Sequence, residues 1–355
     1  MIKYVGADVH GQTTCFCVLD SSGQKIMETT VATTSSALES FVRALSGEVH
    51  VAFEEGTQAQ WLYYLLSRQV KRVVVCDPKK LSQRRSGISK TDKIDAERIA
   101  DLLRKDELSP VYHDYGGLDA LRHFVRNHQT LTRDSSRVKL QLKALYRANG
   151  IPTPGVTVYS RTGREAYVDL LVGRGLRARA EAQYVRLDVL DGLVEQARTD
   201  MLGEAKKYKV RRLLQTVPGI GPVRSAMLIA QVGTPHRFPN KRAFWAYCGL
   251  AIVQHGTGLA SVTKSGKIVL NAKALKTRGL NRNRNPHLKD LFKGAVLTAI
   301  QKPEFATYLE SFTARGLHVN VAKVAVARKL ATIVLTVWKK GERYDPSRLA
   351  VKKNA

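Results

Sequence analysis

The chain contains few cysteines, few acidic residues and no long apolar run. Four of its 355 residues are cysteine, and none of them lies in the Cys-x-x-Cys pairs typical of zinc sites. Neither a zinc site nor a disulfide framework is therefore expected, and a reducing cytoplasm is favoured. No stretch of about 18 apolar residues exists, which excludes a membrane span. Residues 1–5 lack the basic-then-apolar order of a signal peptide and are typical of a strand.

The shortage of acidic residues leaves a large positive charge. The chain has 58 Lys and Arg against 30 Asp and Glu, for a net charge of +28. Solubility alone does not require such an excess, whereas Lys and Arg that neutralise phosphates release condensed counterions and so favour binding. A nucleic-acid partner is therefore expected. The apolar fraction of 44% is that of a folded globular chain, and the length favours two or three domains.

The first hundred residues alternate between apolar strands and helices. Strands are predicted over residues 2–9, 13–20, 25–32, 49–54 and 72–76. Helices are predicted from Ser35 and over 58–69. Thr91 is the expected N-cap of a third helix, whose apolar stripe includes Ile94. Residues 79–91 are basic and rich in Ser, which indicates a loop. The order β-β-β-α-β-α-β-α predicts a mixed α/β sheet with helices on both faces.

The middle third has the apolar spacing of a long paired helix. Near-heptad spacing is found from about residue 117 at Leu118, Leu121, Val125, Leu131, Val138, Leu142 and Leu145. This pattern predicts a helix that packs against another helix. Residues 151–155 (Ile-Pro-Thr-Pro-Gly) end it, and a second helix is predicted over about 175–208. One face of this basic region could lie along a nucleic-acid backbone. Equally, that face could be a solvated coiled-coil surface that holds two subunits together.

Four carboxylates lie on separate predicted elements of the first hundred residues. They are Asp8 on the first strand, Glu54 on the fourth, and Asp92 with Asp95 on one face of a helix. Converging carboxylates repel one another unless a cation lies between them. A divalent metal pair bound by oxygen ligands would align an in-line phosphoryl displacement. Strand alternation favours Glu54 over its neighbour Glu55 as the ligand. Together with the strand order, these acids are similar to those of the RNase H-like nuclease fold.

The segment Val-Pro-Gly-Ile-Gly-Pro at 217–222 precedes an apolar helical pattern and looks like a helix-hairpin-helix element. Gly219 and Gly221 would allow the backbone to approach closely, and amides at the start of a helix can bind a phosphate oxygen. Arg224 and the charge of the chain favour phosphate binding here. The competing interpretation is a tight turn between two packed helices.

Hydroxyl groups gather between residues 257 and 265, and arginines follow between residues 278 and 284. The hydroxyl residues are Thr257, Ser261, Thr263 and Ser265. In such a segment these residues usually make hydrogen bonds within a loop, and no single one of them stands out as a nucleophile. The arginines Arg278, Arg282 and Arg284 suit contacts to phosphate and sugar.

The whole chain resembles the DEDD transposases of bacterial insertion sequences, which are bridge-RNA-guided serine recombinases. The matching motifs are Gly-Ala-Asp-Val-His at 6–10, Val-Ala-Phe-Glu at 51–54, Lys-Thr-Asp-Lys-Ile-Asp-Ala at 90–96, Pro-Gly-Ile-Gly-Pro at 218–222, Phe-Pro at 238–239, Gly-Leu at 249–250 and Thr-Arg-Gly-Leu-Asn at 277–281. The match continues at 289–294, 326–330 and 337–342. The Lys-Thr-Asp-x-x-Asp-Ala motif is far more specific than any single acid.

The resemblance implies three parts. They are a RuvC-like, RNase H-like domain at 1–112, a coiled-coil helical stalk at 113–208, and a mainly helical transposase domain with the helix-hairpin-helix element at 209–355. It implies a catalytic set that binds Mg²⁺ or Mn²⁺, formed by Asp8, Glu54, Asp92 and Asp95. It also implies a tetramer, as a dimer of dimers, that acts on donor and target DNA under the guidance of a structured RNA, at the nucleoid of a bacterial cell.

The catalytic serine of the family falls on Thr257 of this chain, counted from the Gly-Leu pair at 249–250. A threonine hydroxyl can attack phosphorus but is more crowded than that of serine. Ser261 and Ser265 are the alternatives if the loop is shifted. A covalent ester between the hydroxyl and DNA would conserve the phosphodiester energy for rejoining.

Two other classes of protein compete with an RNA-guided recombinase. The acids alone would fit a metal-dependent, structure-selective nuclease of the junction-resolving kind, which leaves hydrolysed ends and no protein–DNA adduct. Threonine in place of the family serine would fit a decayed relative that binds nucleic acid without strand transfer. A structured non-coding stretch beside the gene, able to pair with the element ends and the target, would distinguish these classes.

Overall fold

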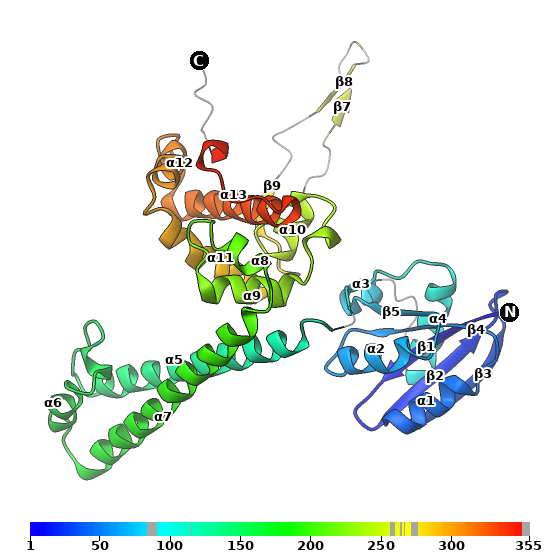
Figure 1. The fold of residues 1–355 in the computed structure, drawn as a ribbon, viewed down its shortest axis with the longest axis horizontal. Helices are drawn as coiled ribbons and strands as arrows, with labels where there is room; N and C mark the ends of the chain where they lie inside the picture. The colour runs from blue at the N-terminus through cyan, green and yellow to red at the C-terminus, as the bar shows by residue number, and fades with distance from the viewer. Residues whose placement is uncertain are drawn as a thin grey trace. The chain divides into compact units, whose positions relative to one another are not determined.

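The computed structural model describes residues 1–83, 91–114, 116–255, 260–262, 265, 267–270 and 276–349. The chain divides into two compact units, Met1–Gly116 and Gly117–Ala355. The elements of the first unit, drawn from blue to cyan in Figure 1, are β1 (Ile2–Val9), β2 (Thr13–Leu19), β3 (Lys25–Ala32), α1 (Ser35–Arg43), β4 (Glu48–Glu54), α2 (Ala59–Ser67), β5 (Arg72–Cys76), α3 (Pro78–Gln83) and α4 (Asp92–Arg104). The division of the chain into three parts stays a prediction.

The strands of the first unit form one mixed sheet in the order β3-β2-β1-β4-β5. β2 pairs antiparallel with both β1 and β3, because tight turns connect these three strands. β1, β4 and β5 are parallel, and helices connect β3 to β4 and β4 to β5. The predicted mixed sheet is therefore confirmed, and its strand order is consistent with an RNase H-like domain.

Helices α1 and α2 cover one face of the sheet. Val5, Ala7 and Phe16 are fully buried on this face. They pack in one apolar cluster with Leu38 of α1 and Leu62 of α2. The side chains that alternate with them along the strands point to the opposite face, as the two-residue period of a strand requires.

Helix α4 covers the opposite face and lies very close to β1. A Cβ atom added at Gly6 would lie 2.0 Å from the carbonyl oxygen of Ala96 and 2.5 Å from the backbone nitrogen of Ala100. Only glycine therefore allows this approach of helix to strand. Ile99 is fully buried in the contact, whereas Ile94 is 44% exposed, so its assignment to the apolar stripe is wrong. The helical period turns this first-turn side chain towards solvent.

The loop predicted over 79–91 is wrong in its first part, where the chain forms the short helix α3. Asp77 Oδ1 accepts a hydrogen bond from the Lys79 amide at 2.9 Å, and Leu81 is buried. A cap and an apolar anchor therefore stabilise this turn despite its basic composition. Residues 84–90 lie outside the described part of the chain.

The second unit is mostly helical. Its elements, drawn from green to red in Figure 1, are α5 (Asp119–Ala148), η1 (Thr157–Tyr159), α6 (Arg164–Asp169), α7 (Arg174–Ala205), α8 (Val210–Leu214), α9 (Pro222–Val232), η2 (Pro235–Arg237), α10 (Lys241–Tyr247), β6 (Ile252–His255), β7 (Ala260–Val262), β8 (Ile268–Leu270), β9 (Lys276–Leu280), α11 (Pro286–Ala299), α12 (Pro303–Thr313), α13 (Val319–Lys340) and η4 (Pro346–Leu349). Two-stranded pairings join β6 with β9 and β7 with β8. None of the described helices has both the length and the apolar character needed to cross a bilayer.

Helices α5 and α7 pack against each other as an antiparallel pair (Figure 1). The Ser135 hydroxyl donates to Asp191 Oδ1 at 2.9 Å, and further along the pair the hydroxyls of Tyr146 and Tyr184 lie 3.0 Å apart. The predicted long helix and its helical partner are thus confirmed, and the partner belongs to the same chain. A coiled coil between subunits stays a prediction.

The two ends of this helical pair contribute to different apolar cores. Val138 and Leu142 pack with Leu187 in a cluster of their own. Leu121 and Val125, at the start of α5, belong instead to the large core that α9, α10, α11 and α13 surround. Part of the predicted heptad pattern of α5 therefore encodes contact with these C-terminal helices as well as with the end of α7, whose Met201 and Ala205 belong to the same core.

Replacing Gly6 with alanine should destabilise the first unit, because the added methyl group would overlap backbone atoms of α4. Overpacking of this kind costs about 1–3 kcal/mol. The midpoint of thermal unfolding should fall accordingly. Gly11→Ala is the matched control, since nothing lies within 4 Å of a Cβ atom added there. An equal loss in both variants would contradict the close contact.

Candidate functional site

The carboxyl ends of β1 and β4 bring two of the predicted acids to one edge of the sheet. Ala7 pairs with Phe53 in the parallel register, so the next residues, Asp8 and Glu54, lie side by side. Both continue the face that contains Gly6, which is the face covered by α4. The parallel pairing of the two strands therefore places both carboxylates on the same side of the sheet.

The first turn of α4 brings the other two acids to this edge. The Thr91 side chain accepts a hydrogen bond from the Ile94 amide at 3.3 Å and so fixes where the helix begins, as its sequence predicts. Asp92 and Asp95 follow directly in the first turn. The charges of both residues reach Asp8 and raise the pKa of its carboxyl group.

A histidine that the sequence argument did not assign completes the cluster. His10 Nε2 lies 3.3 Å from Asp8 Oδ2 and 3.3 Å from Asp92 Oδ2. One ligand atom from each of these three residues lies within 4.8 Å of the others, which is an arrangement able to hold a metal ion. The only signal in the sequence is the Asp-x-His spacing at the end of a strand, which places both side chains on one face.

Asp8 lies in an environment that disfavours its negative charge. Burial is the main cause, and it raises the pKa of the Asp8 carboxyl above its usual value. His10 opposes this shift, and the charges of Asp92 and Asp95 reinforce it. A cation bound between these groups would stabilise the ionised form of all of them.

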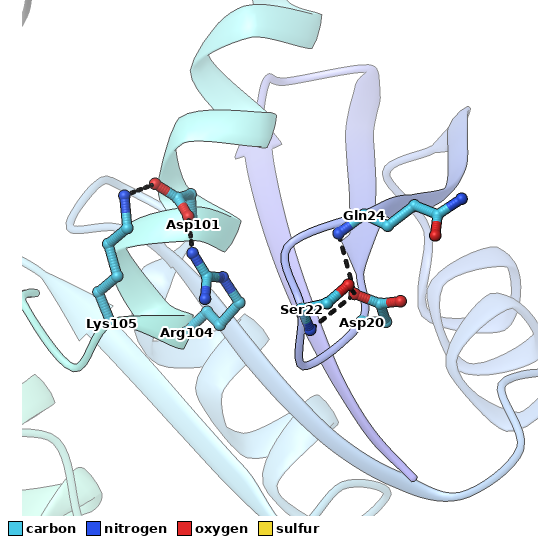
Figure 2. Close-up of polar contacts among 6 residues, drawn as sticks. All are labelled: Asp20, Ser22, Gln24, Asp101, Arg104 and Lys105. Carbon is cyan, nitrogen blue, oxygen red and sulfur yellow. Dashed lines mark hydrogen bonds and ion pairs between the residues drawn. The ribbon is translucent and has the colours of Figure 1, made fainter.

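Other acids of the first unit have their charges compensated locally. Figure 2 shows Asp101, near the opposite end of α4, accepting hydrogen bonds from Arg104 at 2.7 Å and Lys105 at 2.5 Å. Burial of Asp101 is outweighed by these bonds, which hold the pKa of its carboxyl below the usual range. Asp20 accepts hydrogen bonds from residues of its own turn. Asp8 differs from both because two of its nearest charged neighbours are acids.

Glu55, the competitor of Glu54, is bound on the other side of the sheet. Its Oε2 lies 2.6 Å from Nε2 of His113, whose Nδ1 lies 2.9 Å from Oε1 of Gln60. The His113 ring also contacts Tyr63 of α2 in a tilted arrangement, with ring centroids 5.3 Å apart. Since α2 and α4 cover opposite faces, this contact favours Glu54 as the acid that belongs to the cluster.

The turn at 217–221 joins α8 to α9 and packs closely against α11. Gly219 has φ +80°, and a Cβ atom there would lie 2.3 Å from the Ala295 carbonyl oxygen. Gly221 is the N-cap residue of α9. Arg224 Nη1 donates to the Gly219 carbonyl at 2.8 Å and contacts Thr298 Oγ1 at 3.2 Å. The tight turn between packed helices is thus present, and phosphate binding by these residues stays a prediction.

The residues predicted to supply the nucleophile and the basic contacts are described only in part. Thr257 lies outside the described residues, Ser261 belongs to β7, and Arg278 belongs to β9. Arg282 is exposed, whereas Arg284 is half-buried and its Nη1 donates to the carbonyls of residues 281 and 282. Arg284 therefore stabilises its own loop. Ser261 and the acidic cluster belong to different units of the chain.

Comparison with known proteins gives two family matches and several similar proteins. Residues 5–148 match the transposase family model of the DEDD type of IS110, and residues 211–310 match the model described as "Transposase IS116/IS110/IS902 family". The chain is 28% identical over 258 residues to the "Transposase for insertion sequence element IS1533" of Leptospira borgpetersenii, covering 67% of this chain and 72% of that protein. It is 26% identical over 265 residues to the corresponding protein of element IS1328 from Yersinia enterocolitica, covering 71% and 73%.

The two matched ranges together account for more than half of the chain, and the first of them contains the whole acidic cluster. A third relative, the "Putative transposase y4qE" of Sinorhizobium fredii, is 23% identical over 222 residues, which cover 61% of this chain and 55% of that protein. The strand order, the clustered acids and both family matches lead to one conclusion: the chain belongs to the IS110-type family of DEDD transposases.

Proposed function

We propose that the chain is a recombinase that cleaves and rejoins DNA strands between an insertion-sequence donor and a target. The observation that supports it most directly is the clustering of Asp8, His10 and Asp92 at one edge of the sheet, in a chain of net charge +28. Membership of a transposase family supports the same class of reaction. The proposed metal-binding and catalytic acids are Asp8, Glu54, Asp92 and Asp95.

The donor set at this edge fits a divalent cation. Carboxylate oxygens are the ligands that Mg²⁺ prefers, and Mn²⁺ binds the same oxygens and also accepts an imidazole nitrogen. Burial and the charges of Asp92 and Asp95 raise the pKa of Asp8, and a bound cation would oppose this shift. When bound, the cation would supply Lewis-acid polarisation of the phosphoryl group and neutralise developing negative charge.

The residues of the chain would position this site through backbone packing. The Thr91 cap and the contact at Gly6 fix α4, and α4 carries Asp92 and Asp95. His10 contacts the carboxylates of both Asp8 and Asp92 and so orients them towards each other. Preorganisation of this kind avoids rearrangement when the phosphate is bound.

A hydroxyl of the 257–265 segment is the proposed nucleophile, with Thr257 at the family position and Ser261 as the less crowded alternative. Its oxygen would form a bond to phosphorus while the bond from phosphorus to a DNA oxygen breaks. That DNA oxygen takes up a proton and leaves as a hydroxyl. Attack by a DNA hydroxyl on the protein–DNA ester would then rejoin the strand and release the side-chain hydroxyl.

A guide RNA and a homo-oligomer belong to the same proposal. The family resemblance implies a structured RNA that pairs with donor and target, and a dimer of dimers that holds both DNA molecules. The net charge of +28 supports binding to two polyanions. Arg282, which is exposed, is better placed than Arg284 to contact phosphate, since Arg284 is used within its loop.

A metal-dependent nuclease is the second candidate function. It is favoured by one observation, namely the clustering of Asp8, His10 and Asp92, which does not depend on a hydroxyl nucleophile. The acids of the cluster would suffice for hydrolysis. The two functions differ in whether the cleaved strand becomes attached to the protein.

Asp92→Asn should abolish strand cleavage while nucleic-acid affinity stays nearly unchanged. Removing one carboxylate weakens the metal site, and loss of a transition-state contact costs on the order of 10²-fold or more in rate. The measurements are cleavage of donor DNA with Mg²⁺ or Mn²⁺ and binding of the same DNA by fluorescence anisotropy. Asp101→Asn is the matched control at the far end of α4. Full activity of Asp92→Asn, or cleavage in EDTA, would refute the assignment.

The stability gained from divalent metal should depend on pH and on Asp8. Because the pKa of Asp8 is raised, protons compete with the metal for this carboxylate up to a higher pH than at an ordinary aspartate, so the metal-induced rise in unfolding temperature should shrink as the pH falls through this pKa. Without metal, ionised Asp8 destabilises the fold above that pKa. Asp8→Asn should therefore be at least as stable as the parent without metal and should show no response to MgCl₂ or MnCl₂. A normal response would remove Asp8 from the site.

The reaction should leave a covalent adduct on a hydroxyl of the 257–265 segment. Nicked donor DNA that cannot be rejoined would trap it, and peptide mass spectrometry would locate the modified residue. An adduct on Thr257 or Ser261 is the expected result, and Thr257→Val or Ser261→Ala should remove it. Free 3′-hydroxyl and 5′-phosphate ends without an adduct would contradict the recombinase and support the nuclease function.

A further inference from the structure

One side of α5 carries two arginines without acidic partners. Arg126, Gln129 and Arg133 are spaced three and four residues apart, so they share one side of the helix. Both arginines are exposed, and neither has an ion-pair partner among the residues that the structure describes. Gln129 Nε2, which lies between them, is buried and lacks a hydrogen-bond partner within the same described residues.

Several other basic residues of α5 are paired with acids. Arg137 Nη1 lies 3.0 Å from Asp134 Oδ1, and Lys139 Nζ lies 3.4 Å from Asp191 Oδ1. These pairs are exposed and of the kind that contributes little to stability. Lys143 and Arg147 instead donate hydrogen bonds to the Gly155 carbonyl and the Thr153 hydroxyl. Arg126 and Arg133 have neither kind of partner among the described residues.

The first turns of α11 add further positive charge beside this stripe. Arg133 and Arg126 lie close enough to His287 that, together with burial as the main cause, they lower the pKa of its imidazole. Burial also lowers the pKa of Lys289, and the neighbouring Arg284 and Lys293 lower it further. Groups of like charge are thus crowded across two helices.

A packed core holds the two helices in place. Leu121 and Val125 of α5 belong to the same apolar cluster as Leu288 and Phe292 of α11. Helix α9 packs against both of them (Figure 1). The basic side chains therefore project from rigid elements, and their crowding is a property of the fold rather than of a loop.

Crowded, partly desolvated cations repel one another and so raise the free energy of the unbound protein. Asp290, the single acid of α11, offsets only part of this repulsion. A polyanion would turn the repulsion into a favourable interaction. The stripe from Arg126 to Arg133 extends about 10 Å along α5, which is the axial length of about three phosphates on one strand of B-DNA.

We propose that this surface, formed by Arg126, Gln129, Arg133, His287, Lys289 and Lys293 and called here the α5–α11 surface, binds the phosphate backbone of duplex DNA. The choice of DNA rests on the proposed function, in which donor and target are DNA. The two arginines contact neighbouring phosphates, and the Gln129 side chain turns outward so that its amide, buried in the unbound protein, donates to a phosphate oxygen. Such contacts set position and affinity and carry little base information.

The test is the salt dependence of binding of the full-length protein to a 30-base-pair duplex of mixed sequence, in EDTA to prevent cleavage. In the double variant Arg126→Gln/Arg133→Gln, the slope of log affinity against log salt should decrease by about 2, because each lost phosphate contact contributes about 0.9. Glutamine keeps the helix propensity, so the unfolding midpoint should not change. Arg126→Lys/Arg133→Lys should keep the slope.

The matched control is Arg179→Gln/Arg186→Gln, which removes two exposed charges from α7 and should leave the slope unchanged. An unchanged slope in the Arg126/Arg133 variant, or an equal decrease in the control, would overturn the proposal. A slope that decreases for an RNA hairpin of equal charge but not for the duplex would assign the surface to RNA and also overturn it. The metal-induced stabilisation of the Arg126/Arg133 variant should be normal. A wrong assignment of the α5–α11 surface can therefore be distinguished from a wrong assignment of the metal site.

Discussion

The contact between Gly6 and the backbone of α4 is the constraint on which the acidic cluster depends. No side chain separates strand from helix at this point, so the helix axis is fixed against β1. Ala96, which forms the contact, lies one turn after Asp92. The position of Asp92 relative to Asp8 is therefore set by backbone packing and by the Thr91 cap. The carboxylates converge although they repel one another, because the fold holds them there.

The protein concentrates charge of each sign in a separate place. The acidic cluster has the ligands to hold a cation, and the α5–α11 surface is the proposed site of an anion. Both arrangements are unfavourable for the unbound chain and become favourable with a partner. A phosphate near the acidic cluster would be repelled until a divalent ion neutralises the acids. In the proposed reaction the ion would thus remove the repulsion between the acids and the phosphate of the substrate, in addition to activating that phosphate.

Local patterns in the sequence predict much of the first unit. The apolar, β-branched and aromatic composition of the strands predicts β1, β2 and β3 with short turns between them. Alternation along β4 places Glu54 on one face, so Asp8 and Glu54 could be proposed for one site in advance. His10 could not be assigned, because its contact with Asp92 depends on where α4 lies across the sheet. The partner of Glu55, His113, is 58 residues away in the sequence, so local patterns could not predict their contact either. Helix α3 was missed because one capping carboxylate and one buried leucine outweigh a basic composition.

The seam between α5 and α7 is already filled by a single chain. A helix from a second copy could enter it only by separating the hydroxyl pair of Tyr146 and Tyr184 and the apolar residues around them. Assembly that leaves this hairpin closed would therefore add helices to its outer side, with two helices of one copy lying on two of another. Val185 and Val189, which are 64% and 59% exposed, face outward on α7 and would lie in such a layer. The unit of assembly would be the hairpin, and the geometry that of a four-helix contact rather than a two-stranded coil.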